Sequence, residues 1–117
     1  MHELYIAQCI LNVVADSLPP DIPADSVSQV NVQVGRLDAV VPANLIFLFD
    51  VAKKSPNYGM PRASLNLKTV EAAGVCRDCN SPFTPELPIF LCPECGSGAV
   101  EITGGRGITL TGIEAET

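Results

Sequence analysis

The chain has 117 residues, of which 47% are apolar and 17% are charged, and its formal net charge is -6 at pH 7. A chain of this length supports one modest hydrophobic core with a small appendage, and it is too short for two independent cores. The negative charge argues against a nucleic-acid ligand, and no apolar run approaches the roughly 20 residues of a membrane-spanning helix.

Two segments have the apolar periodicity of helices. Residues 4–18 carry apolar side chains at helical spacing, and Pro19 ends that helix. Pro42 suits the first turn of a second helix. The run at residues 45–49 is apolar on most faces, which predicts a central position for this helix. The polar stretch at residues 53–61 is expected to be a loop.

Alternating apolar and polar side chains predict three strands in the main sheet, at residues 30–34, 65–68 and 108–111. Residues 99–103 predict another short strand, beside a group of cysteines. Since two strands alone make a marginal sheet, we expect the third to return after the cysteines and complete it. The predicted fold class is therefore α+β, with two helices on a small three-stranded antiparallel sheet.

The cysteine-rich stretch lies between the second and third strands of that sheet, so it is expected to be an insertion. We assign residues 1–73 plus 105–117 to the helix-and-sheet domain and residues 74–104 to the inserted domain. Glycines near Gly74 and Gly105 would give flexible links between the two.

The most specific motif is a pair of Cys-x2-Cys sequences separated by twelve residues. Each pair can form a tight turn, and two such turns can converge on one ion. Pro93 pre-sets the second turn, and Gly96 lets the chain leave it with a positive φ. Four thiolates in a tetrahedron suit Zn²⁺ and leave no position open for a substrate, so we expect a structural zinc site. Its ligands are Cys76, Cys79, Cys92 and Cys95.

Three other uses of these cysteines compete with a zinc site. Two disulfides would need an oxidising compartment. Residues 1–30, however, contain no basic segment, no continuous apolar run and no cleavage site of the kind that a secretory leader has. A thioredoxin-like redox pair would need one motif at the start of a helix, whereas here two matched pairs close on each other. A rubredoxin-like iron site has the same four-sulfur geometry, and the sequence alone does not separate it from zinc.

A second candidate metal site lies at the first three residues, Met1, His2 and Glu3. The α-amine, the His2 backbone nitrogen and the imidazole can close adjacent chelate rings. Glu3 can add a fourth donor, either its backbone nitrogen or its carboxylate. Planar nitrogen donors suit Ni²⁺ or Cu²⁺ better than Zn²⁺. The ordinary alternative is a solvated terminus, in which Glu3 complements the helix dipole.

Four sequence features together resemble the HypA/HybF family of hydrogenase maturation nickel chaperones: the opening Met-His-Glu-Leu, Val-Gln-Val-Gly-Arg-Leu at residues 32–37, the apolar stretch at residues 41–49, and the cysteine motif with Cys-Pro-Glu-Cys-Gly. The resemblance covers essentially the whole chain. It implies a helix-and-sheet nickel domain with an inserted zinc domain. It further implies that Met1, His2 and Glu3 bind nickel and that Cys76, Cys79, Cys92 and Cys95 hold zinc.

From the resemblance we expect a non-enzymatic, cytoplasmic nickel metallochaperone. Its implied partners are a HypB-like GTPase, the large-subunit precursor of a [NiFe] hydrogenase and urease accessory proteins, with no nucleic acid and no membrane. Two other classes stay open. A structural zinc-ribbon adaptor would bind a protein partner without exchangeable metal, and a rubredoxin-like carrier would contain iron. The sequence leaves open whether the protein is a monomer or a homodimer.

Overall fold

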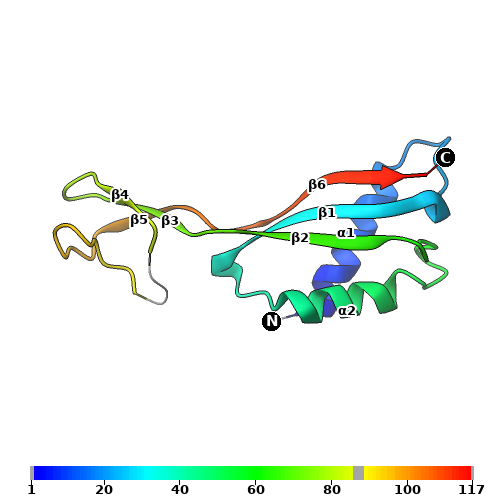
Figure 1. The fold of residues 1–117 in the computed structure, drawn as a ribbon, viewed down its shortest axis with the longest axis horizontal. Coiled ribbons are helices and arrows are strands. Elements are labelled where there is room, and N and C mark those ends of the chain that lie inside the picture. The colour runs from blue at the N-terminus through cyan, green and yellow to red at the C-terminus, as the bar shows by residue number, and fades with distance from the viewer. Residues whose placement is uncertain (1, 86–88, 117) are drawn as a thin grey trace. The chain divides into compact units, whose positions relative to one another are not determined.

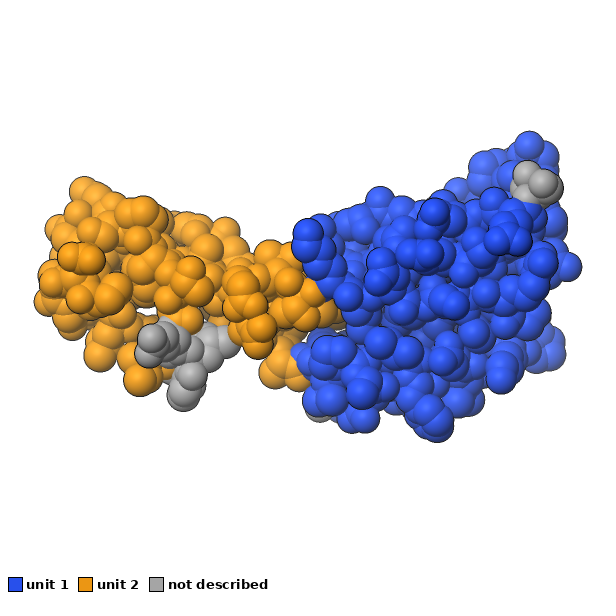
Figure 2. Space-filling view, in the orientation of Figure 1, with its two compact units in different colours: residues 1–33, 40–68, 109–117 blue, residues 34–39, 69–108 orange. Residues whose placement is uncertain are grey.

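The computed structural model describes residues 2–85 and 89–116. The chain divides into two compact units (Figure 2). Unit 1 comprises Met1–Gln33, Val40–Lys68 and Thr109–Thr117, and unit 2 comprises Val34–Ala39 and Thr69–Ile108. The assignment of residues 74–104 to a separately folding inserted domain stays a prediction.

Unit 1 contains both α-helices and most of a three-stranded sheet (Figure 1). The predicted class, two helices with a small three-stranded sheet and a cysteine-bearing unit, is confirmed. None of the described helices is long and apolar enough to cross a bilayer. The elements are α1 (Glu3–Ser17), η1 (Ala24–Ser26), β1 (Val27–Gly35), α2 (Pro42–Ala52), β2 (Ser64–Val70) and β6 (Ile108–Ala115), with the strands in the order β2-β1-β6.

The sheet is mixed, whereas antiparallel pairing was expected throughout. The Glu116 amide donates to the Ser26 carbonyl at 2.8 Å, and the Gly35 amide donates to the Gly107 carbonyl at 2.9 Å, so β6 runs antiparallel to β1. In Figure 1, β1 and β2 run in the same direction, because α2 carries the chain back between them. A helical crossover of this kind produces a parallel pair, as a short hairpin does not.

The core of unit 1 includes the faces where the two helices pack together and the buried apolar residues of β1. Leu11 and Val14 of α1 are fully buried, as are Leu45 and Phe49 of α2. Burying a side chain of this size stabilises the fold by roughly 1.5–3 kcal/mol. Over residues 30–34 of β1 the buried valines, Val30, Val32 and Val34, alternate with half-buried polar residues, as the sequence predicts; Val27, at the start of the strand, is also buried.

The segment between α2 and β2 contributes to this core, although its sequence predicts a polar loop. Met60 is 0% exposed. The Lys53 ammonium donates to the Ala63 carbonyl at 2.6 Å and lies 3.2 Å from the Asp50 carboxylate. These bonds close the segment around Met60, which supplies the core with a large flexible side chain.

Unit 2 contains a second three-stranded sheet, in the order β4-β3-β5. Both pairings are antiparallel, with Gly74 opposite Phe83 on one side and Cys76 opposite Val100 on the other. The sequence predicted the strand at residues 99–103 but missed the other two. The strands are β3 (Ala73–Cys76), β4 (Pro82–Phe83) and β5 (Val100–Gly104).

The segment that follows β1 also belongs to unit 2 and contains the short helix η2 (Arg36–Asp38). The Leu37 amide donates to the Gly105 carbonyl at 2.9 Å, and the Gly107 amide donates to an Asp38 carboxylate oxygen at 2.7 Å. The Arg36 guanidinium donates from Nε and one terminal nitrogen to the Glu71 carboxylate, at 2.6–3.0 Å. Hydrogen bonds and an ion pair therefore tie this segment to the chain on both sides of the cysteine-rich stretch.

Candidate metal centres

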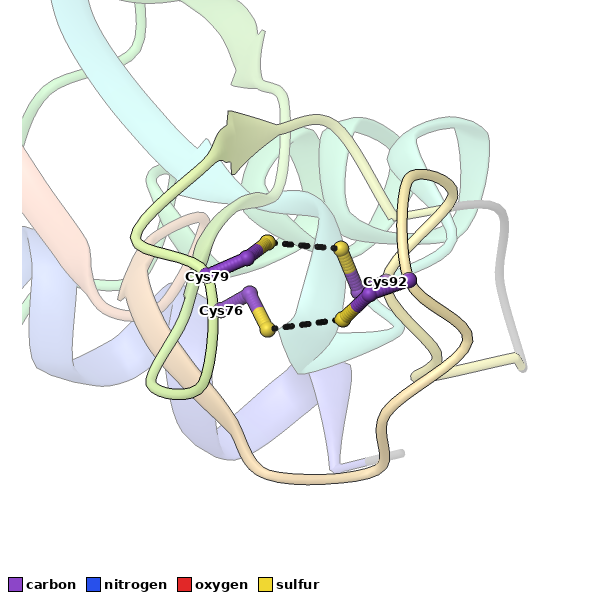
Figure 3. A group of neighbouring side chains, drawn as sticks. Cys76, Cys79 and Cys92 are labelled. Atoms are coloured by element: carbon purple, nitrogen blue, oxygen red, sulfur yellow. Dashed lines mark hydrogen bonds between the residues drawn. The ribbon is translucent and has the colours of Figure 1, made fainter.

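The four cysteines of the two motifs come together in unit 2. Their sulfur atoms all lie within 4.8 Å of one another. Cys76 and Cys95 are 3.5 Å apart at Sγ, and Cys79 and Cys92 are 3.6 Å apart (Figure 3). A tetrahedron with Zn–S bonds of about 2.3 Å places its sulfurs about 3.8 Å from one another. The observed spacing and the four thiol donors therefore fit one zinc ion.

The two cysteine turns have the same backbone geometry. In the first, the Asn80 amide donates to the Cys76 carbonyl at 2.8 Å, and the Cys76 amide donates to the Ser81 carbonyl at 3.0 Å. The second repeats this pattern: Gly96 donates to Cys92 at 2.8 Å, and Cys92 donates to Ser97 at 2.9 Å. A positive φ follows each pair, 62° at Asn80 and 75° at Gly96.

This repeat could have been read in the sequence, because both motifs continue as Cys-x2-Cys-x-Ser. The motif spacing predicted the cysteines and Gly96 but not the two serines. Each serine supplies the carbonyl that completes its turn, and Asn80 occupies the position of Gly96 because asparagine tolerates the left-handed region. The serines thus help to shape the turns that present the thiols.

The environments of the two exposed thiols differ. Hydrogen bonds from the side chain and backbone of Ser81 lower the pKa of the Cys79 thiol to about 6. At Cys95 the backbone of Ser97 acts in the same direction, but the neighbouring thiols, led by Cys76, together with lost solvation raise the pKa to about 12. Because neighbouring thiolates repel one another, a cation among the sulfurs would favour the ionised form of Cys95, which its raised pKa opposes.

A hydrogen bond outside the group of sulfurs also links the two turns. The Ser97 hydroxyl donates to the Asp78 carboxylate and accepts from the Ala99 amide at 3.0 Å. The Arg77 amide also donates to the Ala99 carbonyl at 2.8 Å. The first turn is therefore attached to the segment that follows the second turn, and this attachment keeps the two pairs of thiols close to each other.

The second candidate site lies at the start of α1, and its first predicted ligand, Met1, is outside the described residues. His2 is exposed and is the residue before the first turn of α1; its side chain makes no capping hydrogen bond. Its carbonyl accepts from the Ile6 amide at 3.0 Å, which begins the helix. The His2 imidazole is therefore available to a ligand.

Glu3 has a different environment from that of a solvated first-turn residue. It is 7% exposed, and its carboxylate accepts a hydrogen bond at 3.3 Å from the amide of Val41, the residue that precedes α2. The carboxylate thus lies at the N-terminal ends of both helices, where negative charge is favoured. The backbone amide of Glu3, in the first turn of α1, has no acceptor within the helix.

The sequence and the fold are both similar to those of known proteins. Residues 1–115 match the family model described as HypA: Hydrogenase/urease nickel incorporation, metallochaperone. A protein of Desulfosudis oleivorans named hydrogenase maturation factor HypA is 36% identical over 115 residues, with 97% of each chain covered. A protein of the same name from Desulfatibacillum aliphaticivorans is 39% identical, over 97% of this chain and 86% of that one.

Among solved structures, the solution structure of the Ni metallochaperone HypA from Helicobacter pylori matches with a TM-score of 0.66. It is 23% identical, and the match covers 98% of this chain and 97% of that one. This likeness shows a shared fold. The family match and the two relatives show that the chain belongs to the HypA family.

Proposed function

We propose that this member of the HypA family is a nickel metallochaperone for hydrogenase maturation that binds Ni²⁺ at its N-terminus. The donors are the Met1 amine, the His2 backbone nitrogen, the His2 imidazole and the backbone nitrogen of Glu3. The family description names nickel incorporation, and the relatives cited above are named hydrogenase maturation factors, which supports this role.

The observation that carries the proposal is the different use of the His2 and Glu3 side chains. The imidazole is exposed and makes no capping bond, whereas the Glu3 carboxylate is buried against the Val41 amide. Of the two donors that Glu3 can offer, the backbone nitrogen is therefore favoured. A set of four nitrogens in one plane suits Ni²⁺, and it leaves the carboxylate to offset the positive ends of two helix dipoles.

In the same proposal, Cys76, Cys79, Cys92 and Cys95 hold a structural zinc ion. Four sulfur donors complete a tetrahedron, so zinc there supplies folding energy to unit 2 and has no position open for substrate. The two metals then have separate roles, since zinc stays in the protein and nickel is cargo.

We further propose that the nickel is passed to the large-subunit precursor of a [NiFe] hydrogenase, in the cytoplasm and together with a HypB-like GTPase. The protein acts as a carrier in this proposal and catalyses no reaction. Acidification promotes release, because protons compete with nickel for the amine and imidazole nitrogens.

The test is calorimetric titration of Ni²⁺ into tag-free protein that begins at Met1. His2→Ala, acetylation of the amine and one added residue before Met1 should each abolish nickel binding, because each breaks a chelate ring. Zinc content and the far-ultraviolet circular dichroism spectrum should not change. Unchanged nickel affinity in His2→Ala would refute the proposed site and favour the zinc-ribbon adaptor without exchangeable metal.

A further inference from the structure

The two cysteine turns share their backbone geometry, so differences between their side chains can be compared position by position. In each turn the first cysteine is buried and the second is exposed: Cys76 and Cys92 are buried, and Cys79 and Cys95 are exposed. A reagent in solution therefore reaches Cys79 and Cys95 first. What separates these two sulfurs is the use of the serine two positions after each of them.

The Ser81 hydroxyl lies beside the cysteine of its own turn, where its oxygen accepts a hydrogen bond from the Cys79 thiol. Its Oγ lies 3.3 Å from the Cys79 sulfur. When that sulfur is a zinc-bound thiolate, only the hydroxyl has a proton to donate, so Ser81 withdraws electron density from Cys79. Both exposed sulfurs have a backbone hydrogen bond from the serine of their own turn, and a second bond, from the hydroxyl, makes Cys79 the weaker nucleophile.

Ser97 occupies the equivalent position in the second turn, but its hydroxyl is used elsewhere. A serine hydroxyl has one proton, and that of Ser97 is donated to the Asp78 carboxylate. The same oxygen accepts from the Ala99 amide at 3.0 Å, which fixes its orientation. Among the residues that the structure describes, no hydroxyl donates to Cys95.

The space beside the two exposed sulfurs also differs. Asn80 follows Cys79, whereas Gly96 follows Cys95. A Cβ atom placed on Gly96 would meet no atom within 4 Å. The second turn therefore leaves an open approach next to its exposed sulfur, at a residue that has no side chain to cover it.

We propose that Cys95 is the sulfur at which thiol-reactive electrophiles open the zinc site, and that Asp78 favours this reaction by retaining the hydroxyl proton of Ser97. The inference rests on the zinc ion of the proposed function. With N-ethylmaleimide as the electrophile, the Cys95 sulfur forms a bond to one alkene carbon, and the other carbon takes a proton from water. The thioether that results is a poor zinc ligand, so the metal is released.

The test uses the full-length protein loaded with one zinc ion, with the zinc content measured first. Limiting N-ethylmaleimide is added, modified cysteines are mapped by peptide mass spectrometry, and released zinc is followed with a chromogenic chelator. Cys95 should be modified severalfold faster than Cys79, and zinc release should follow Cys95 modification. Modification of Cys9, which lies in α1, should release no zinc.

The repeat supplies a matched pair of variants. Ser81→Ala removes the hydroxyl from Cys79 and should raise its modification rate severalfold. Ser97→Ala should not raise the rate at Cys95 comparably, because the Ser97 hydroxyl does not donate to that sulfur and the backbone bond from Arg77 to Ala99 still joins the two turns. Asp78→Ala frees the Ser97 hydroxyl to turn toward Cys95 and should slow modification there.

The proposal is refuted if a zinc-loaded protein is modified first at Cys79 or equally at both sulfurs. It is also refuted if Ser97→Ala accelerates Cys95 as much as Ser81→Ala accelerates Cys79. Absence of zinc from the purified protein would instead refute the zinc site of the proposed function, and this inference with it.

Discussion

Replacing Glu3 separates the two donors that this residue can offer to nickel. Glu3→Gln keeps an oxygen that can accept from the Val41 amide, but it removes the carboxylate charge. Glu3→Ala removes both the acceptor and the charge. Neither variant removes the backbone nitrogen of residue 3. If that nitrogen is the nickel donor, Glu3→Gln should bind nickel as the wild-type protein does, within about threefold.

The stability of the two variants should differ by an amount that the structure indicates. The hydrogen bond to Val41 is long, at 3.3 Å, so its loss is set at the value of an ordinary hydrogen bond, about 1 kcal/mol, and below that of a short bond to a charged acceptor. Loss of negative charge at a helix N-terminus adds about 0.3–1 kcal/mol. Glu3→Ala should therefore lose about 1–2 kcal/mol, and Glu3→Gln about 0.3–1 kcal/mol. At roughly 4 °C per kcal/mol, the melting temperature should fall by about 4–8 °C and about 1–4 °C, respectively.

Thermal unfolding followed by circular dichroism measures the stability of each variant, and titration of the same tag-free samples with Ni²⁺ measures its nickel affinity. His2→Ala serves as the control that should lose nickel without a comparable loss of stability. A Glu3→Gln variant that is as stable as expected but has lost nickel binding would refute the reasoning. That result would identify the carboxylate as a nickel ligand and show that its bond to Val41 breaks when the metal binds.

Three further changes test other parts of the structure. The Cys92→Ser variant should lose zinc, and the cysteine-bearing part of unit 2 should become disordered while the helices of unit 1 persist, because so small a unit depends on its ion. Metal analysis and amide resonances would show this, and retained zinc would contradict it. Gly35→Ala should destabilise the protein by roughly 1–3 kcal/mol in thermal unfolding, because a Cβ there would lie 2.1 Å from the Gly105 carbonyl oxygen. Gly98→Ala, whose Cβ would meet only the Leu91 side chain at 3.8 Å, is the matched control and should be nearly neutral. The Arg36 guanidinium lowers the pKa of Glu71, so the ion pair stabilises the folded protein above that pKa, and this contribution is lost as the pH falls through it. The small difference in melting temperature between the wild-type protein and Glu71→Gln should therefore vanish in acid. A difference that grew on acidification would contradict the assignment.

Most secondary structure could be predicted from the sequence, because helix and strand periodicity is a local property of the chain. The apolar stripe before Pro19 and the run after Pro42 correspond to α1 and α2. The four cysteines that come together could also be predicted, since the spacing within each Cys-x2-Cys turn is set by the backbone over a few residues. The repeated serine was equally local, and attention to the residues after each pair would have found it.

The tertiary structure decided the features that depend on distant partners. The sequence places Glu3 in the first turn of a helix whether its side chain is solvated or buried. Only the hydrogen bond from the Val41 amide, 38 residues away, shows that the carboxylate already has a partner. Met60 lies in a polar stretch, yet it is buried because the packing of unit 1 requires a large side chain there. Ser97 and Ser81 have equivalent places in the sequence, and only the position of Asp78 makes one hydroxyl serve the zinc site and the other serve the link between turns. Spacing along the chain thus determined which residues could bind metal. The partners of the Glu3 carboxylate and of the two serine hydroxyls were decided by contacts that form only when the chain folds, because a hydrogen bond depends on where its partner lies in space.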